Sequence, residues 1–124
     1  MLSMYSQLED LSIRNNKIRD LDPNPRGIFT DLIKLIFLDL SNNHISRLVN
    51  RLTFVGLSDL RELSLKGNQI TEISGDVFRP LEKLERLDLA ANRITILGST
   101  VFEGNTNLQE LYLRNNVLRE VKFS

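Results

Sequence analysis

The stretch LERLDLAANRITIL, residues 84–97, decides the fold of this chain, because its pattern of leucines and one asparagine occurs four further times. The other copies are LEDLSIRNNKIRDL at 8–21, LIFLDLSNNHISRL at 35–48, LRELSLKGNQITEI at 60–73 and LQELYLRNNVLREV at 108–121. They begin at 8, 35, 60, 84 and 108, so the steps are 27, 25, 24 and 24 residues. Tandem copies at a nearly constant period predict a solenoid of stacked coils.

The middle of each copy has the pattern of a short β-strand. In Leu87-Asp88-Leu89 the two leucines flank a polar residue, so they point inward while the aspartate points outward. Equivalent strands stack into a parallel sheet with about 4.8 Å between neighbours. One coil cannot cover its own leucines, and neighbouring coils therefore bury one another.

An asparagine follows each strand. A carboxamide both donates and accepts hydrogen bonds, so it can satisfy backbone groups of the turn in its own coil and in the next coil. We interpret these residues as a structural ladder rather than a binding site. The ladder consists of Asn16, Asn43, Asn68, Asn92 and Asn116.

The far side of each coil carries a phenylalanine, at Phe29, Phe54, Phe78 and Phe102. Pro or Gly follows two of them and disfavours long helices, so we expect short helical turns or extended loops there. Leu32, Leu57 and Leu81 are expected to face inward, and Asn105, which takes the place of this leucine in the fourth coil, to weaken packing locally. The three extra residues of the first coil predict an exposed loop over residues 22–28.

These repeats resemble the leucine-rich repeat family, in particular its typical class with a 24-residue period, which also describes the ectodomain repeats of Toll-like, Slit-type and adhesion receptors. The resemblance covers Leu8 to about Val121. It implies an α/β-type repeat solenoid, a right-handed superhelix with short parallel strands on its concave face and loops or short helical turns on its convex face. It also implies binding of proteins through the concave sheet, and it provides no catalytic residues to transfer.

We expect one solenoid domain. Residues 1–7 are interpreted as the tail of a preceding repeat, followed by repeats at 8–34, 35–59, 60–83 and 84–107 and a truncated repeat at 108–124. Extracellular members of the family carry cysteine-rich caps, and this chain contains no cysteine. Because both ends of the stack would expose core, we expect a fragment of a longer array, with further repeats at both ends in the parent protein.

Composition argues against several classes of partner. Sixteen basic and sixteen acidic residues balance to a net charge of zero, which gives no reason to expect nucleic acid. No apolar run approaches the roughly 20 residues of a membrane span, so no direct membrane contact is expected. His44 is the only histidine and has no neighbouring pair of carboxylates that would suggest a metal site. We therefore expect no catalytic residues, cofactor or metal.

The candidate binding surface consists of the outward residues of the predicted strands, which form three rows along the stack. The first row is Asp10, Phe37, Glu62, Arg86 and Glu110; the second row is Ser12, Asp39, Ser64, Asp88 and Tyr112; the third row is Arg14, Ser41, Lys66, Ala90 and Arg114. From these rows the candidate partner-binding residues are Asp10, Arg14, Phe37, Asp39, Glu62, Lys66, Arg86, Asp88, Glu110, Tyr112 and Arg114.

Two features of these rows have competing interpretations. The aromatic rings of Phe37 and Tyr112 are either contact residues for a partner or lie across their neighbours. The run Glu62, Arg86, Glu110 places opposite charges on adjacent strands, and we favour a surface salt-bridge ladder over direct partner contact.

The sequence thus predicts a non-catalytic module that binds a protein ligand on its concave sheet, within an extracellular or cell-surface receptor or adhesion protein. An alternative is an intracellular scaffold or adaptor that uses the same face, which the absence of cysteines and of Asn-X-Ser/Thr triplets favours. A third hypothesis is a regulatory module attached to an enzyme elsewhere in the parent protein.

Overall fold

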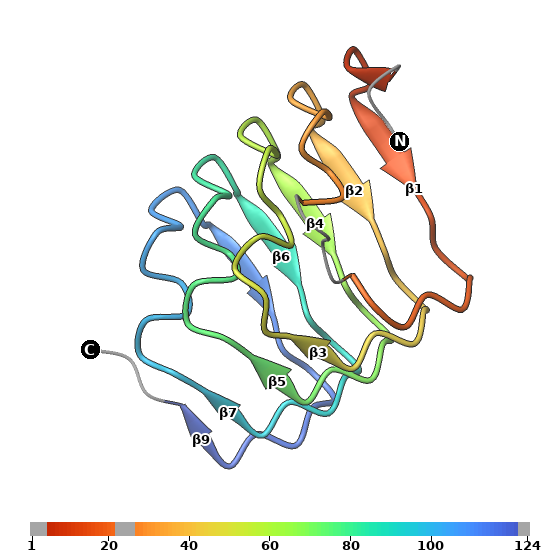
Figure 1. Cartoon of the computed structure of the whole chain (residues 1–124). Helices are drawn as coiled ribbons and strands as arrows, with labels where there is room; N and C mark the ends of the chain where they lie inside the picture. Colours follow the sequence, from red (N-terminus) through yellow and green to blue (C-terminus); the bar gives the residue numbers. More distant parts are fainter. Residues whose placement is uncertain (1–4, 22–26, 122–124) are drawn as a thin grey trace.

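The computed structural model describes residues 5–21 and 27–121, and these residues form a solenoid in which the five copies stack in register (Figure 1). Its main sheet has five parallel strands in the order β1-β2-β4-β6-β8. The strands are β1 (Asp10–Ser12), β2 (Phe37–Asp39), β4 (Glu62–Ser64), β6 (Arg86–Asp88) and β8 (Glu110–Tyr112). Each strand is the centre of one predicted copy, and the solenoid architecture expected from the repeats is confirmed.

A second set of strands, only two residues long, was not predicted. It consists of β3 (Arg47–Leu48), β5 (Glu72–Ile73), β7 (Ile96–Leu97) and β9 (Glu120–Val121). These strands pair in parallel as β3 with β5 and β7 with β9, on a different side of the coils from the main sheet (Figure 1). Turns and loops connect the rest, and the described part of the chain contains no α-helix.

The core consists of rows of leucines that repeat from coil to coil. Leu38, Leu63 and Leu87, at the centres of β2, β4 and β6, are at most 1% exposed. Leu11 and Leu111 occupy the same position in the first and last coils and are only partly buried, because each has a neighbouring coil on one side only. Burial of each leucine therefore depends on the coils beside it.

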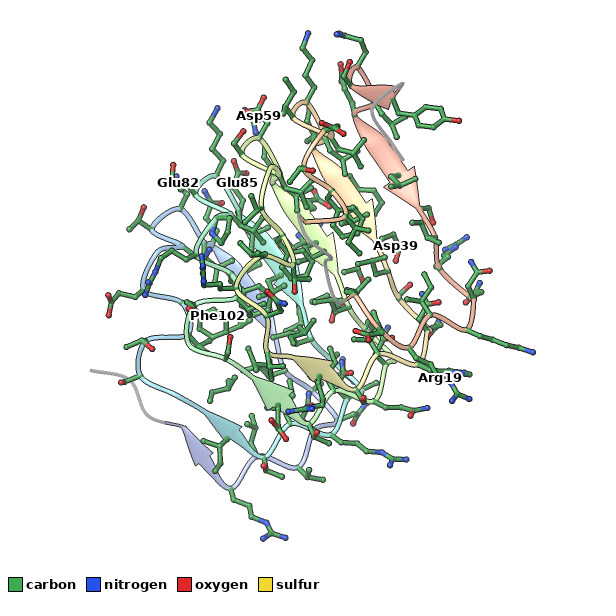
Figure 2. The ribbon with its side chains drawn as sticks, viewed as in Figure 1. Arg19, Asp39, Asp59, Glu82, Glu85 and Phe102 are labelled. Atoms are coloured by element: carbon green, nitrogen blue, oxygen red, sulfur yellow. The ribbon has the colours of Figure 1, made fainter. Side chains whose placement is uncertain are left out.

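The four phenylalanines form a continuous stack on the far side of the core. Successive ring centroids lie 6.3, 5.9 and 6.0 Å apart, and the planes of successive rings differ by 14° or less. Phe54 and Phe78 are fully buried, whereas Phe102, labelled in Figure 2, is partly exposed in the fourth coil. The stack joins neighbouring coils opposite the main sheet.

Asn105, which was expected to weaken packing locally, forms hydrogen bonds to the neighbouring coil. The side chain is 5% exposed, and its Nδ2 donates hydrogen bonds to the carbonyl oxygens of Phe78 (2.9 Å) and Leu81 (3.0 Å) in the preceding coil. Its Oδ1 is buried without a hydrogen-bond partner among the described residues. Asn105 thus exchanges apolar contacts for two hydrogen bonds between coils.

The predicted exposed loop of the first coil is described only at its end, since residues 22–26 lie outside the described residues, as do 1–4 and 122–124. Ile28 is exposed, but Gly27 is buried, contrary to the prediction for this segment. A Cβ atom at residue 27 would lie 2.5 Å from the carbonyl oxygen of Leu52. The second coil therefore packs directly against this backbone, and no larger side chain fits.

Candidate binding face

The face of the main sheet is held in place by the asparagine turns. Asn68 donates from Nδ2 to the carbonyls of Leu65 (2.9 Å) and Leu40 (3.1 Å), and its Oδ1 accepts from the backbone N–H of Ile45 (3.1 Å). Asn43, Asn92 and Asn116 repeat this arrangement. The bonds between coils run to the preceding coil and not, as expected from the sequence, to the next one.

Asn16 differs from the other members of the ladder. Its side chain is exposed and donates only within its own coil, to the carbonyls of Ile13 (3.0 Å) and Arg14 (3.1 Å). The corresponding bonds between coils require a preceding coil, and Asn16 belongs to the first one described.

The residue before each ladder asparagine adopts a left-handed backbone conformation, which was not predicted. These residues are Asn15 (φ 60°), Asn42 (55°), Gly67 (73°), Ala91 (55°) and Asn115 (58°). Asparagine and glycine are the residues that adopt this conformation most readily. The Asn-Asn and Gly-Asn pairs were therefore an available signal for a tight turn at the end of each strand.

The strand register places the first two predicted rows on the open face of the sheet. Asp10, Phe37, Glu62, Arg86 and Glu110 are aligned across the five strands, as are Ser12, Asp39, Ser64, Asp88 and Tyr112. Of the two aromatic candidates, Tyr112 is 40% exposed and Phe37 is half-buried. Both lie on this face, in the second and fifth coils.

The third row needs a correction, because two of its five side chains do not face solvent. Arg14, Lys66 and Arg114 are exposed, but Ser41 and Ala90 are buried. The third row is thus a set of three long cationic side chains on alternate coils, separated by small covered residues.

The buried positions of the third row are linked to two aspartates of the second row. Oδ1 of Asp39 accepts the backbone N–H of Ser41 (2.9 Å), and Oδ1 of Asp88 accepts that of Ala90 (3.0 Å). A carboxylate bonded to the backbone two residues later tightens the turn. Asp39, labelled in Figure 2, and Asp88 therefore help to shape the end of their strands.

The charged side chains of the first row form ion pairs with one another. Nε of Arg86 donates to Oε2 of Glu110, and Nη1 of Arg86 lies 3.8 Å from Oε2 of Glu62. The hydrogen bond from Arg86 is the main cause that lowers the pKa of Glu110; desolvation opposes it, and the positive charge of Arg86 adds to it. The same pairing raises the pKa of Arg86. These side chains are solvent-exposed, so the ladder orients charge on the face more than it stabilises the fold.

The described residues contain no group of three or more His, Cys, Asp or Glu side chains placed to hold a metal ion. Within the same ranges, no helix has the length and apolar character needed to cross a membrane.

Comparison with protein families reproduces the repeat pattern. The model of the family described as leucine rich repeat matches residues 6–70, 49–94 and 82–122. The chain belongs to the leucine-rich repeat family. A comparison with curated proteins found no match.

Solved structures of leucine-rich repeat proteins share this fold. The complex of TLR13 with ssRNA13 matches with a TM-score of 0.74 and 34% identity, over 94% of this chain and 18% of that one. Toll in the Drosophila Toll–Spatzle complex matches with a TM-score of 0.80 and 32% identity, over 90% of this chain and 14% of that one. The chain thus spans less than a fifth of either receptor. The functional domain of InlJ from Listeria monocytogenes, at 23% identity and a TM-score of 0.66 over 93% of this chain and 22% of that one, shares the fold alone.

Proposed function

We propose that this chain is a non-catalytic protein-binding module that holds a protein ligand against the open face of its main sheet. The observation that carries the proposal is the contrast between the two sides of the strands. Leucines are repeated beneath the sheet, while the first and second rows above it contain acidic, basic, hydroxyl and aromatic side chains. A rigid scaffold that presents varied side chains in fixed rows is suited to recognition.

The solved relatives support ligand binding by such repeats. TLR13 was solved with an RNA and Toll with Spatzle. For this chain we favour a protein ligand, because the first row mixes both signs of charge and the face carries Phe37 and Tyr112, the kinds of side chain enriched at protein interfaces.

The proposal extends to the parent protein. We infer an extracellular or cell-surface leucine-rich repeat receptor or adhesion protein, in which further repeats continue the stack at both ends and the repeat boundaries are those of the sequence analysis. The alternative is an intracellular scaffold that uses the same face, which the lack of cysteines and of glycosylation triplets favours. The coding sequence on either side of this segment distinguishes the two, through a secretion signal and cysteine-rich caps.

The test is capture of a partner by the immobilised chain, followed by binding measurements with the purified partner. Tyr112→Ala and Phe37→Ala should each weaken binding by about tenfold, as expected for an aromatic contact at an interface. Ile33→Ala is the matched control, because Ile33 is 50% exposed and lies outside the sheet rows.

Unchanged affinity of both aromatic variants, together with a loss in Ile33→Ala, would place the binding surface elsewhere. The ligand would instead be a nucleic acid if a single-stranded RNA bound more tightly than the captured protein and if its binding required the same rows of side chains.

A further inference from the structure

The turns that follow the five main strands form one edge of the molecule, which we call the asparagine rim. It consists of residues 14–17, 41–44, 66–69, 90–93 and 114–117, and it contains none of the sixteen acidic residues of the chain. It does contain five exposed basic residues, Arg14, Lys17, Lys66, Arg93 and Arg114. In Figure 1 the rim lies where the arrowheads of the main strands end.

The opposite edge, where the strands begin, has mixed charge. Figure 2 labels Asp59, Glu82 and Glu85 there, and Arg19 near the asparagine rim. On this opposite edge Nζ of Lys83 forms an ion pair with Oδ1 of Asp59 (2.9 Å), and Nε of Arg61 lies 3.9 Å from Oε2 of Glu85. Lys83 and Arg61 on that edge are therefore neutralised by carboxylates of neighbouring coils.

The rim cations have no such partners among the residues that the structure describes. Within the described ranges, ion pairs involve Arg47, Arg61, Lys83 and Arg86, and none involves a basic residue of the rim. Asp39 and Asp88 bond backbone N–H groups of the rim, so its five cations outnumber these two carboxylates. The net charge of zero thus hides a local excess of positive charge along this edge. Such an excess attracts an anionic ligand and speeds its association.

The cations of the third row have a regular spacing. Arg14, Lys66 and Arg114 belong to alternate coils, because the buried Ser41 and Ala90 occupy the coils between them. Adjacent strands of a sheet are about 4.8 Å apart, so two coils correspond to about 10 Å. The three cations therefore form a line with a step of about 10 Å that runs across the strands.

An extended peptide provides carboxylates at a matching interval. In the polyproline II conformation a chain has three residues per turn and rises about 3.1 Å per residue, so every third side chain lies on the same side at steps of about 9.3 Å. A carboxylate at each of these positions would meet one cation of the third row in a charge-assisted hydrogen bond. Asn15, Asn42 and Asn115 lie beside the third row, and Nδ2 of Asn42 donates to Oδ1 of Asn15 (3.1 Å). The amide groups that remain exposed, including that of Asn115, can bond the backbone of the peptide.

We propose that the asparagine rim binds an extended acidic segment of the protein ligand, with a carboxylate at every third residue facing Arg14, Lys66 and Arg114. This inference rests on the proposed protein-binding function and adds the chemistry of the ligand. A single-stranded nucleic acid fits the rim less well, because such ligands stack their bases on aromatic side chains and the rim contains no Phe, Tyr or Trp.

The test uses the full chain and a labelled proline-rich peptide with Glu at every third position, followed by fluorescence anisotropy at low salt. The triple variant R14Q/K66Q/R114Q should bind the peptide about tenfold more weakly, because each surface ion pair contributes only a few-fold. The matched control K34Q/R51Q/R79Q removes the same charge from exposed cations outside the rim and should retain the affinity. Added salt should weaken binding to the unmodified chain.

Three results would overturn the inference: no binding of the spaced peptide, equal losses in the two triple variants, or equal binding of a peptide whose Glu residues are contiguous. A uridine oligonucleotide that binds more tightly than the peptide and depends on the same three cations would assign the rim to nucleic acid instead. Phe37→Ala and Tyr112→Ala separate this inference from the proposed function, because capture of a protein that needs both rings can persist while the spaced peptide fails to bind.

Discussion

At the scale of single residues, the ladder asparagines contribute to stability because they satisfy backbone groups that stacking buries. Asn68 occupies a site that is 6% exposed and bonds backbone atoms of two coils. A side chain without a carboxamide would leave the N–H of Ile45 buried and unpaired. The carbonyls of Leu40 and Leu65 would each lose one of two hydrogen bonds and keep those from Asn43 and Asn92. A buried group left without a partner costs about 1–3 kcal/mol.

Asn68→Ala is therefore expected to lower the free energy of unfolding by about 2 kcal/mol, measured by urea denaturation. Asn16→Ala is the control at the equivalent position of the first coil, where the side chain is exposed and bonds only its own coil, and it should cost less than about 1 kcal/mol. Equal losses in the two variants would contradict a ladder that acts between coils.

The left-handed turn residues provide a substitution that should stabilise the fold instead of destabilising it. Ala91, with φ of 55°, is the one member of this set that is neither Asn nor Gly. The Cβ atom of Ala91 costs about 1–2 kcal/mol in that conformation. Glycine would relieve this strain, but it would also increase the entropy of the unfolded chain, which offsets part of the gain.

Ala91→Gly should thus raise the free energy of unfolding by about 0.5–1 kcal/mol. The neighbouring Ala90→Gly tests the reverse case, because residue 90 is buried and is not among the residues with positive φ, so the loss of its methyl group should be destabilising. Thermal or urea unfolding of both variants provides the measurement, and destabilisation by Ala91→Gly would show that no strain is relieved.

At the scale of elements, the five main strands could be predicted because each has an apolar-polar alternation that recurs in every coil. The two-residue strands β3, β5, β7 and β9 could not, since they are too short for any periodicity. They also depend on contact between coils, as in the bond from the N–H of Ser74 to the carbonyl of Leu48 (2.8 Å). Their pairing is a consequence of the stack rather than of local sequence.

The burial of two residues in the third row was also not predicted, although the sequence contains a signal for it. Asp39 and Asp88 each precede a small residue by two positions, and these small residues are the ones that are buried. The other members of the third row are the cations Arg14, Lys66 and Arg114, and the residue two positions before each of them is not aspartate. An aspartate two positions earlier thus distinguishes the covered residues of this row from the exposed ones.

The ion pairs between β4, β6 and β8 predict a pH-dependent effect. Arg86 lowers the pKa of Glu110, so ionised Glu110 contributes stability that is complete above its unfolded-state pKa and lost as the pH falls through the lower folded-state pKa. In Arg86→Gln the pKa of Glu110 should rise, as followed by NMR titration of its carboxyl group.

Arg47→Gln is the matched control, because Arg47 pairs with Glu72 (3.4 Å) in the small sheet, away from Glu110. It should leave the titration of Glu110 as it was. A pKa of Glu110 that did not move in Arg86→Gln would mean that the two side chains do not pair in solution.

At the scale of the whole molecule, all binding proposals depend on the register of the coils. Stacking in register turns residues about 25 positions apart in sequence into neighbours, and it aligns the rows of the sheet face and the cations of the rim. The sequence was sufficient to predict this architecture because the same leucines recur in every coil. Which outward residues are covered was not predicted, because the bonds from Asp39 and Asp88 that cover them were recognised only in the folded coils.

The register can be measured directly, because the chain contains no cysteine and any introduced pair has no competitor. Arg86 and Glu110 are paired across β6 and β8, so Arg86→Cys/Glu110→Cys places the two Cα atoms about 4.8 Å apart, within the range of a disulfide. Arg86→Cys/Tyr112→Cys is offset by two residues, and its Cα atoms are about 8 Å apart, beyond that range. Under mild oxidation the aligned pair should lose its free thiols rapidly and the offset pair should retain them; equal or faster closure of the offset pair would contradict the stack.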